Sequence, residues 1–98
     1  MEFKKPAVCG TLESSDIMIT ILAQDEKDIT VELSSSVEKQ FGDDIRQLIK
    51  QTVSDLGVDG VFVKAVDKGA LDCTIKARVK TAIFRACEVN TFGGQING

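Results

Sequence analysis

Hydrophobic and polar residues alternate in two short segments of the chain, residues 17–22 and 29–34. In the first segment Ile17, Ile19 and Ile21 stand on one side of the alternation, and the second has a similar set separated by polar residues. A period of two residues predicts β-strands with one buried face. Only the polar residues 24–28 lie between the segments. Because a parallel pair needs a long connection, we expect an antiparallel hairpin.

A longer segment, residues 35–56, has the spacing of an amphipathic helix. Ser35 and Glu38 match a capping box, in which two side chains bond the amide groups at the start of a helix. Gly57 suits the left-handed position that often follows the last residue of a helix. Gly42 weakens the helix by about 1 kcal/mol relative to alanine, which the close approach of another backbone would explain. The apolar residues expected on the buried face are Val37, Phe41, Ile45, Leu48, Ile49, Val53 and Leu56.

The second half of the chain predicts one more strand and one more helix. Residues 60–66 alternate as a strand does, and a turn follows over residues 67–69. Residues 70–79 fit either a strand or a helix, because their apolar positions satisfy both periods. The helical pattern continues further and is rich in alanine, lysine and arginine, so we expect a helix over about residues 70–87. Its expected buried face is Leu71, Ile75, Val79, Ala82, Ile83 and Ala86.

These elements follow one another in the order strand, strand, helix, strand, helix. The order predicts an α+β fold, in which a small and mostly antiparallel sheet packs against two helices. The 98 residues suffice for one core, so we expect a single domain over residues 1–98. We expect a flexible N-terminal arm over about residues 1–15, and a frayed, glycine-rich tail over about residues 90–98.

The composition argues against an autonomous enzyme. The chain has no histidine, which excludes Ser-His and Cys-His nucleophile pairs and the zinc sites that need imidazole. The spacing of its three cysteines, Cys9, Cys73 and Cys87, matches neither a CxxC metal site nor a disulfide framework, so we expect free thiols. We therefore expect no catalytic residue and no metal site.

Hydropathy and charge indicate where the chain acts. No apolar run approaches the roughly 18 residues of a membrane span, and no apolar stretch follows the first lysines as in a secretory signal, so a cytoplasmic location is expected. The net charge is −3, and this acidic balance argues against nucleic acid as a partner. The second half is basic, so Lys76, Lys80 and Arg85 are candidates for contacting an acidic partner or phosphates. A solvated helix face is the favoured interpretation.

Two adjacent hydroxyls, Ser14 and Ser15, lie between two carboxylates in the sequence GTLESSD, residues 10–16. A serine that accepts a phosphoryl group from a separate enzyme needs exposure and a flexible or edge position, which this polar segment provides. Serine and aspartate are also common turn formers, and composition alone favours that simpler interpretation. We expect residues 11–15 to be mobile, because they bury little.

Three parts of the chain resemble, in order and spacing, the acyl carrier protein (gamma subunit) of citrate lyase. They are GTLESSD, the helix end Leu56-Gly57-Val58, and the run from Asp67 through Cys73 to Arg78. The resemblance implies that Ser14 carries a 2'-(5''-phosphoribosyl)-3'-dephospho-CoA prosthetic group, with Ser15 as the alternative. The chain would be a non-catalytic carrier, whose arm holds acetyl and citryl groups on its own thiol while citrate is cleaved to acetate and oxaloacetate.

The resemblance also implies partners. They are the alpha (acyl transferase) and beta (citryl lyase) subunits, the transferase that attaches the prosthetic group, and the ligase that acetylates it. A long tethered arm gives each active site a high effective concentration of the acyl group. Two other interpretations stay open: the carrier subunit of malonate decarboxylase, and a small interaction module without a prosthetic group, in which Ser14 is only a turn residue.

Overall fold

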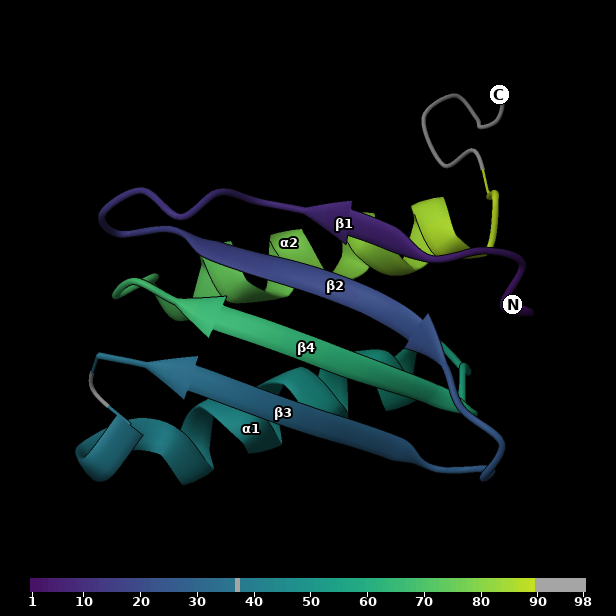
Figure 1. Ribbon diagram of the computed structural model, residues 1–98, viewed down its shortest axis with the longest axis horizontal. Helices are drawn as coiled ribbons and strands as arrows, with labels where there is room; N and C mark the ends of the chain where they lie inside the picture. The colour runs from purple at the N-terminus through teal and green to yellow at the C-terminus, as the bar shows by residue number, and fades with distance from the viewer. Residues whose placement is uncertain (37, 90–98) are drawn as a thin grey trace.

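A computed structural model describes residues 1–36 and 38–89 of the chain. It has one four-stranded sheet with two helices packed on a single face (Figure 1), which confirms the predicted α+β fold. The expected tail over residues 90–98 lies outside the described residues. The strands are β1 (Ala7–Cys9), β2 (Ile17–Ala23), β3 (Ile29–Ser35) and β4 (Val61–Asp67), and the helices are α1 (Glu38–Asp55) and α2 (Asp72–Ala86).

The order of strands in the sheet is β1-β2-β4-β3. Strand β2 is antiparallel to both β1 and β4, whereas β3 and β4 are parallel. The expected hairpin of β2 with β3 is therefore wrong, because β4 lies between them. Hydropathy indicates the buried face of a strand but not which strand pairs with it. Helix α1 is the long connection that allows β4 to lie parallel to β3.

Strand β1 falls inside the segment that we expected to be a flexible arm. Its three residues pair with β2, and Cys9 is buried with 6% of its surface exposed. The backbone amides of Lys4 and Lys5 both donate to the carbonyl of Ala86 at the end of α2. A three-residue strand is too short to show a period in the sequence, so the prediction missed it.

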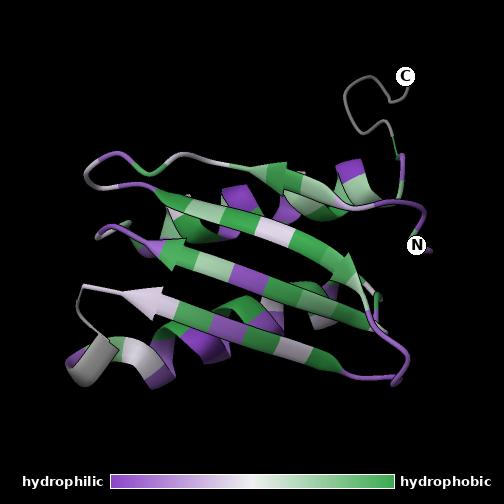
Figure 2. Ribbon diagram, viewed as in Figure 1, coloured by the Kyte–Doolittle hydropathy of each residue, from purple (hydrophilic) through white to green (hydrophobic). Residues whose placement is uncertain are grey.

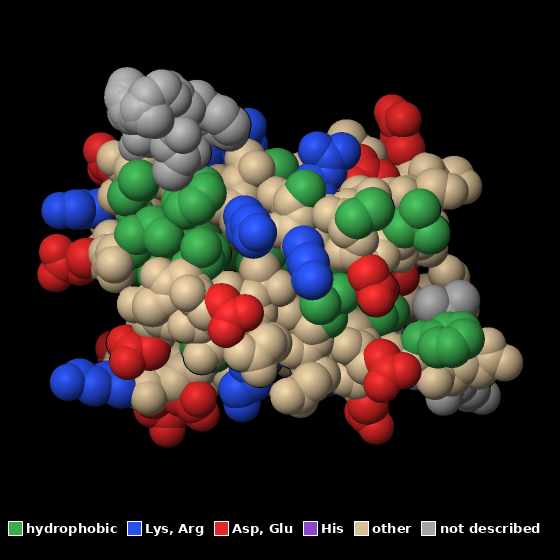
Figure 3. Space-filling model, turned by 180° about the vertical axis from the view of Figure 1, so that it is seen from behind, with side chains coloured by type: hydrophobic (Ala, Val, Ile, Leu, Met, Phe, Trp, Pro, Cys, Tyr) green, Lys and Arg blue, Asp and Glu red, His purple; other side chains and the backbone are tan. Residues whose placement is uncertain are grey.

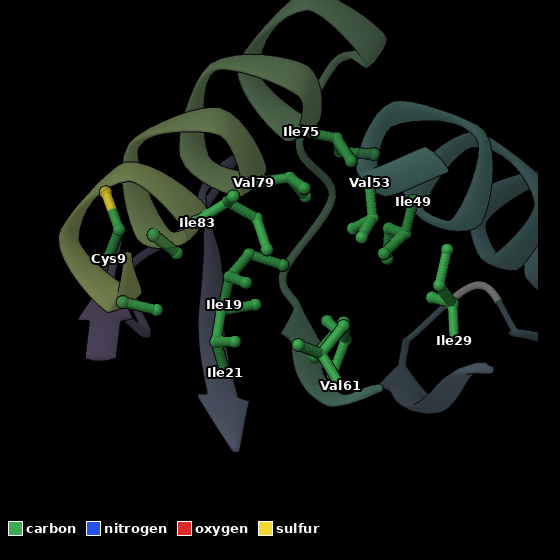
Figure 4. Close-up of a cluster of buried hydrophobic side chains, with 14 of the residues drawn as sticks. Cys9, Ile19, Ile21, Ile29, Ile49, Val53, Val61, Ile75, Val79 and Ile83 are labelled. Carbon is green, nitrogen blue, oxygen red and sulfur yellow. The ribbon is translucent and has the colours of Figure 1, made fainter. Parts of the chain in front are cut away.

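The core fills the space between the sheet and the helices. Alternate side chains of β2 and β4 meet the inner faces of α1 and α2 (Figure 4), and hydrophobic residues run along these strands (Figure 2). Burying one such side chain stabilises the fold by roughly 1.5–3 kcal/mol. The largest fully buried apolar side chains are Ile17, Ile19, Ile21, Ile49, Ile75, Ile83, Val53, Val61, Val63 and Val79.

Both predicted helices form, and the helical interpretation of residues 70–79 is confirmed from residue 72 onward. Two expected core residues are wrong. Phe41 is 51% exposed, while its neighbour Gly42 is buried in its place, and Leu71 precedes α2 and is 71% exposed. Each lies at or just before the start of its helix, where the helical period of the sequence continues but the side chain stays outside the core. Gly57 has the expected positive φ of 74° after α1.

The expected capping box is only partly described. Ser35 ends strand β3, and its hydroxyl donates to the carboxylate of Asp67 at 2.9 Å. Helix α1 begins three residues later, at Glu38, whose side chain lies outside the described residues. The reciprocal contact therefore stays a prediction.

Candidate functional site

The two candidate serines lie at one end of the sheet. Residues 10–16 connect β1 to β2 there, beside the carboxyl ends of β3 and β4 and the first turns of both helices (Figure 1). Both Ser14 and Ser15 are exposed. The hydroxyl of Ser14 has no hydrogen-bond partner within residues 1–36 and 38–89. The loop therefore presents Ser14 to solvent.

Gly10 forms the narrow base of this loop. Its φ is 101°, and a Cβ atom added there would stand 1.8 Å from the carbonyl oxygen of Ile17. No side chain fits at that distance, and the positive φ is itself unfavourable for other residues. Glycine thus lets the two sides of the loop pass each other closely.

The other end of the loop is held by Asp16, which is only 9% exposed. The guanidinium of Arg78, on helix α2, donates two hydrogen bonds to the Asp16 carboxylate, from Nε to Oδ1 at 3.0 Å and from Nη2 to Oδ2 at 2.9 Å. The Thr11 hydroxyl also donates to Oδ2 at 2.7 Å, and the Ile17 amide to Oδ1 at 2.7 Å. Paired Arg–carboxylate bonds of this kind are strong and fix orientation.

These contacts also set the ionisation of the site. The hydrogen bond from Arg78, followed by those from Thr11 and Ile17, holds the pKa of the Asp16 carboxyl well below its usual range. The same pair raises the pKa of Arg78. Asp16 therefore stays charged and is a poor base, so it anchors the loop and does not activate a serine hydroxyl.

Backbone bonds join the loop to the turn that follows β4. The Ser15 amide donates to the carbonyl of Lys68, and the Lys68 amide donates back to the carbonyl of Asp16, both at 2.8 Å. Ser15 has a left-handed φ of 66°. Within the loop, the Asp16 amide donates to the Glu13 carbonyl at 3.2 Å. The mobility expected for residues 11–15 stays a prediction.

Asp67 is a structural residue that the sequence analysis assigned only to a turn. Its side chain is 2% exposed, and one carboxylate oxygen accepts a bond from the Ser35 hydroxyl. The other accepts the amide of Ala70 at 3.0 Å. Asp67 thus ties β3 and β4 to the turn that carries Lys68. The signal in the sequence was an aspartate directly after a buried strand and two residues before a glycine.

A cleft of about 400 Å³ opens between the first turns of α1 and α2, next to the same turn. Gly69 and Ala70 line it from the turn, with apolar side chains from both helices and three carboxylates. At this end, Figure 3 shows acidic and hydrophobic side chains together on the helical side of the molecule. The side chains from the helices and from β4 are Phe41, Ile45, Ile75, Asp44, Asp67 and Asp72.

The basic residues of α2 divide into two groups. Arg78 is bound to Asp16, and Arg85 donates to the carbonyl of Val8 at 2.8 Å. Lys76 and Lys80 are exposed residues of α2. The proposed contact of this stripe with a partner stays a prediction, and it now concerns the two lysines.

Other chemistry is limited in the part of the chain that the structure describes. No group of three or more His, Cys, Asp or Glu residues there could hold a metal ion, and no helix there could cross a membrane. All three cysteines are free thiols. Burial raises the pKa of the Cys87 thiol, which favours its protonated form.

Comparison with known proteins identifies the family of the chain. Residues 4–86 match the family described as malonate decarboxylase delta subunit. The chain is 58% identical over 92 residues to the citrate lyase acyl carrier protein of Streptococcus mutans, covering 94% of this chain and 90% of that protein. It belongs to the citrate lyase acyl carrier protein family. A second relative in this family, the citrate lyase acyl carrier protein of Streptococcus pyogenes serotype M4, is 59% identical over the same length.

The fold of this acyl carrier family also occurs in a related assembly. One chain in the crystal structure of a Pseudomonas malonate decarboxylase hetero-tetramer in complex with malonate superimposes with a TM-score of 0.73, covering 84% of each chain. Sequence identity is only 13%, so this likeness concerns the fold. The resemblance drawn from GTLESSD is thus confirmed at the level of the family, whose named members are acyl carrier proteins.

Proposed function

We propose that this chain is the acyl carrier subunit of citrate lyase and that Ser14 carries its prosthetic group covalently. The observation that supports this most directly is an exposed Ser14 hydroxyl on a loop held firmly at its base. Gly10 closes one side of the loop, and the bond between Asp16 and Arg78 fixes the other. Attachment of a large group at such a point disturbs no packing in the core.

The residues present fit a 2'-(5''-phosphoribosyl)-3'-dephospho-CoA group, because a phosphodiester needs one accessible hydroxyl and space around it. When bound, that group supplies a thiol on which acetyl and citryl groups are carried as thioesters. The chain itself would hold and position the group. It has no histidine, and Asp16 is bound to Arg78, so we assign the base that deprotonates Ser14 to the enzyme that attaches the group.

Ser14 is favoured over Ser15 by the geometry of the loop. The backbone of Ser15 is fixed through its amide to Lys68 and has a left-handed φ. The backbone of Ser14 makes none of these contacts among the described residues, so attachment of a group at Ser14 leaves the bond between the loop and Lys68 undisturbed.

The proposed partners are the alpha acyl transferase and beta citryl lyase subunits, together with the transferase and the ligase that attach and acetylate the group. The cytoplasmic location expected from the sequence is part of this proposal. A carrier role in malonate decarboxylase is the alternative, because the matching family bears that description and a chain of that assembly shares the fold. Turnover of citrate or of malonate by the assembled complex distinguishes the two.

The decisive experiment is the intact mass of the chain purified from its native host during growth on citrate, followed by peptide mapping. We expect the added mass of the phosphoribosyl-dephospho-CoA group on the peptide that contains Ser14, and none in a Ser14→Ala variant. The matched Ser15→Ala variant keeps the added mass. An unmodified wild-type chain under these conditions overturns the proposal in favour of an interaction module, and mass on Ser15 moves the site by one residue.

A further inference from the structure

Three strongly exposed hydrophobic side chains lie at the end of the molecule that presents Ser14. Leu71, Leu12 and Phe41 are 71%, 55% and 51% exposed, and they are the most exposed large hydrophobic residues that the structure describes. They come from three separate segments, which are the Ser14 loop, the turn before α2 and the first turn of α1. Exposed apolar groups that converge on one edge are typical of a protein interface.

The cleft between α1 and α2 lies among these side chains. Phe41 forms part of its wall, and Leu71 follows Ala70, which lines it. Leu12 belongs to the Ser14 loop, whose backbone bonds to Lys68. The next residue, Gly69, also lines the cleft. The turn of residues 68–70 thus joins the Ser14 loop to the cleft. We call this end of the molecule the serine edge: Leu12, Phe41, Leu71 and the lining of the cleft.

We propose that the serine edge is the docking surface for the enzyme that attaches the prosthetic group to Ser14, and this rests on the proposed function. That enzyme has to bring a phosphorus atom within about 3–3.5 Å of the Ser14 oxygen, so its surface must cover the residues beside the loop. The enzymes that act on the far end of the arm have no such requirement. The serine edge thus suits one partner in particular.

The bond chemistry at Ser14 indicates the charge of that partner. The Ser14 oxygen forms a bond to a phosphorus of a nucleotide-derived donor, and the bond from that phosphorus to a phosphate or pyrophosphate leaving group breaks. The hydroxyl proton passes to a base on the enzyme. An enzyme that holds so many phosphate groups does so with lysine and arginine side chains.

The cleft of the serine edge carries the opposite charge: among the described residues three aspartates and no lysine or arginine line it, and the exposed Lys68 lies on the turn beside it. Asp44 and Asp72 are exposed at the cleft, and Glu13 is exposed on the loop. A lysine or arginine from the enzyme fits such a cleft, because its aliphatic stem can lie on Phe41 and Ile75 while its charge meets the two aspartates. Apolar contact supplies affinity, and the charges orient the enzyme over Ser14.

The test measures binding separately from attachment. Wild-type chain and variants, all with Ser14→Ala so that no group is attached, are titrated with the purified attaching enzyme in the absence of donor. We expect Phe41→Ser with Leu71→Ser to raise the dissociation constant by about tenfold or more. Asp44→Asn with Asp72→Asn raises it by about threefold to tenfold and weakens its dependence on salt.

Matched controls come from the same chain. Leu22→Ser removes another exposed hydrophobic residue far from the loop, and Asp55→Asn removes a carboxylate at the opposite end of α1. Both should bind within about twofold of wild type. The substituted side chains at the edge are exposed, so melting curves are expected to match wild type.

The outcomes separate the two proposals. Equal binding by the edge variants and the controls overturns the docking surface, even if the wild-type chain gains its group on Ser14. If the Ser14→Ala chain with no other substitution fails to bind the enzyme, the docking surface is overturned as well. A wild-type chain that binds through the edge and is never modified contradicts the carrier proposal alone.

Discussion

At the scale of single residues, the loop around Ser14 depends on two positions that are not serines. Gly10 removes a steric conflict, and Asp16 collects hydrogen bonds from Arg78, Thr11 and the backbone. The sequence motif drew attention to the hydroxyls because they carry the chemistry. The structure shows that the residues at either end of GTLESSD fix the shape of the loop.

Substitution of Gly10 should lower the free energy of unfolding mainly through a steric conflict. Gly69 is the control that separates this conflict from the effect of a positive φ. In Gly10→Ala the new Cβ meets the Ile17 carbonyl at 1.8 Å, whereas in Gly69→Ala it meets no atom within 4 Å, although both glycines have φ near 100°. We expect Gly69→Ala to lower the free energy of unfolding by about 1–2 kcal/mol and Gly10→Ala by more than that. Urea denaturation of both variants measures the difference, and equal losses would contradict the steric argument.

The lowered pKa of Asp16 predicts a specific dependence of stability on pH. A carboxyl whose pKa is lower in the folded than in the unfolded state stabilises the fold above the unfolded value of about 3.9. That stabilisation is lost as the pH falls through the folded value. The melting temperatures of wild type and Asp16→Asn should therefore differ by a constant amount from about pH 7 to pH 5 and converge in stronger acid.

An exposed aspartate is the control for the substitution itself. Asp55, at the end of α1, bonds only the side chain of Gln51 among the described contacts, so Asp55→Asn should melt close to wild type at pH 7. A gap between wild type and Asp16→Asn that stays constant to about pH 2 would show that the charge of Asp16 is not what matters.

At the scale of elements, helix α2 holds the Ser14 loop through one side chain. Arg78 reaches from the middle of α2 to Asp16 across 62 positions in the sequence. We expect Arg78→Ala to lower the melting temperature and to slow attachment of the prosthetic group severalfold, because the loop loses its anchor. Arg78→Lys restores only part of the rate, since one ammonium cannot make both bonds.

The control for Arg78 is an exposed basic residue outside the candidate contacts. Lys50, on α1, is exposed and is not among the lysines that are candidates for a partner contact, so Lys50→Ala should leave the melting temperature and the attachment rate close to wild type. Mass spectrometry over time gives the rate, and a melting curve gives the stability. If Arg78→Ala melted lower yet accepted the group at the wild-type rate, Arg78 would be structural and would not position the loop.

The elements themselves were largely predictable, and their pairing was not. Periodicity identified both helices and three of the four strands, because each buries one face over at least two turns or five residues. It did not place β4 between β2 and β3, since alternation says nothing about neighbours. Phe41 and Leu71 fit the helical period yet are exposed, because periodicity does not indicate which turns of a helix are covered in the fold.

For the site, the sequence supplied the serine and the structure supplied its setting. The motif GTLESSD pointed to Ser14 without showing that Asp16 pairs with Arg78. That pair joins residues from two distant segments, so no local pattern could indicate it. The cleft also depends on two helices and a turn that meet only in the folded chain.

At the scale of the whole molecule, the two ends of the described chain lie away from Ser14. The amides of Lys4 and Lys5 bond to Ala86 at the end of α2, opposite the loop (Figure 1). Strand β1 runs from there toward the loop, and α2 runs back. A tag or a tether at the N-terminus would therefore leave the serine edge open.

The central place of β4 links the order of synthesis to modification. During translation β2 and β3 emerge before the strand that both of them pair with, and Lys68 and Arg78 emerge later still. The loop at Ser14 consequently cannot take its shape on a nascent chain, although its own residues are among the first made. The attaching enzyme would then act only on completed domains, so that each costly prosthetic group goes to a chain that has already folded.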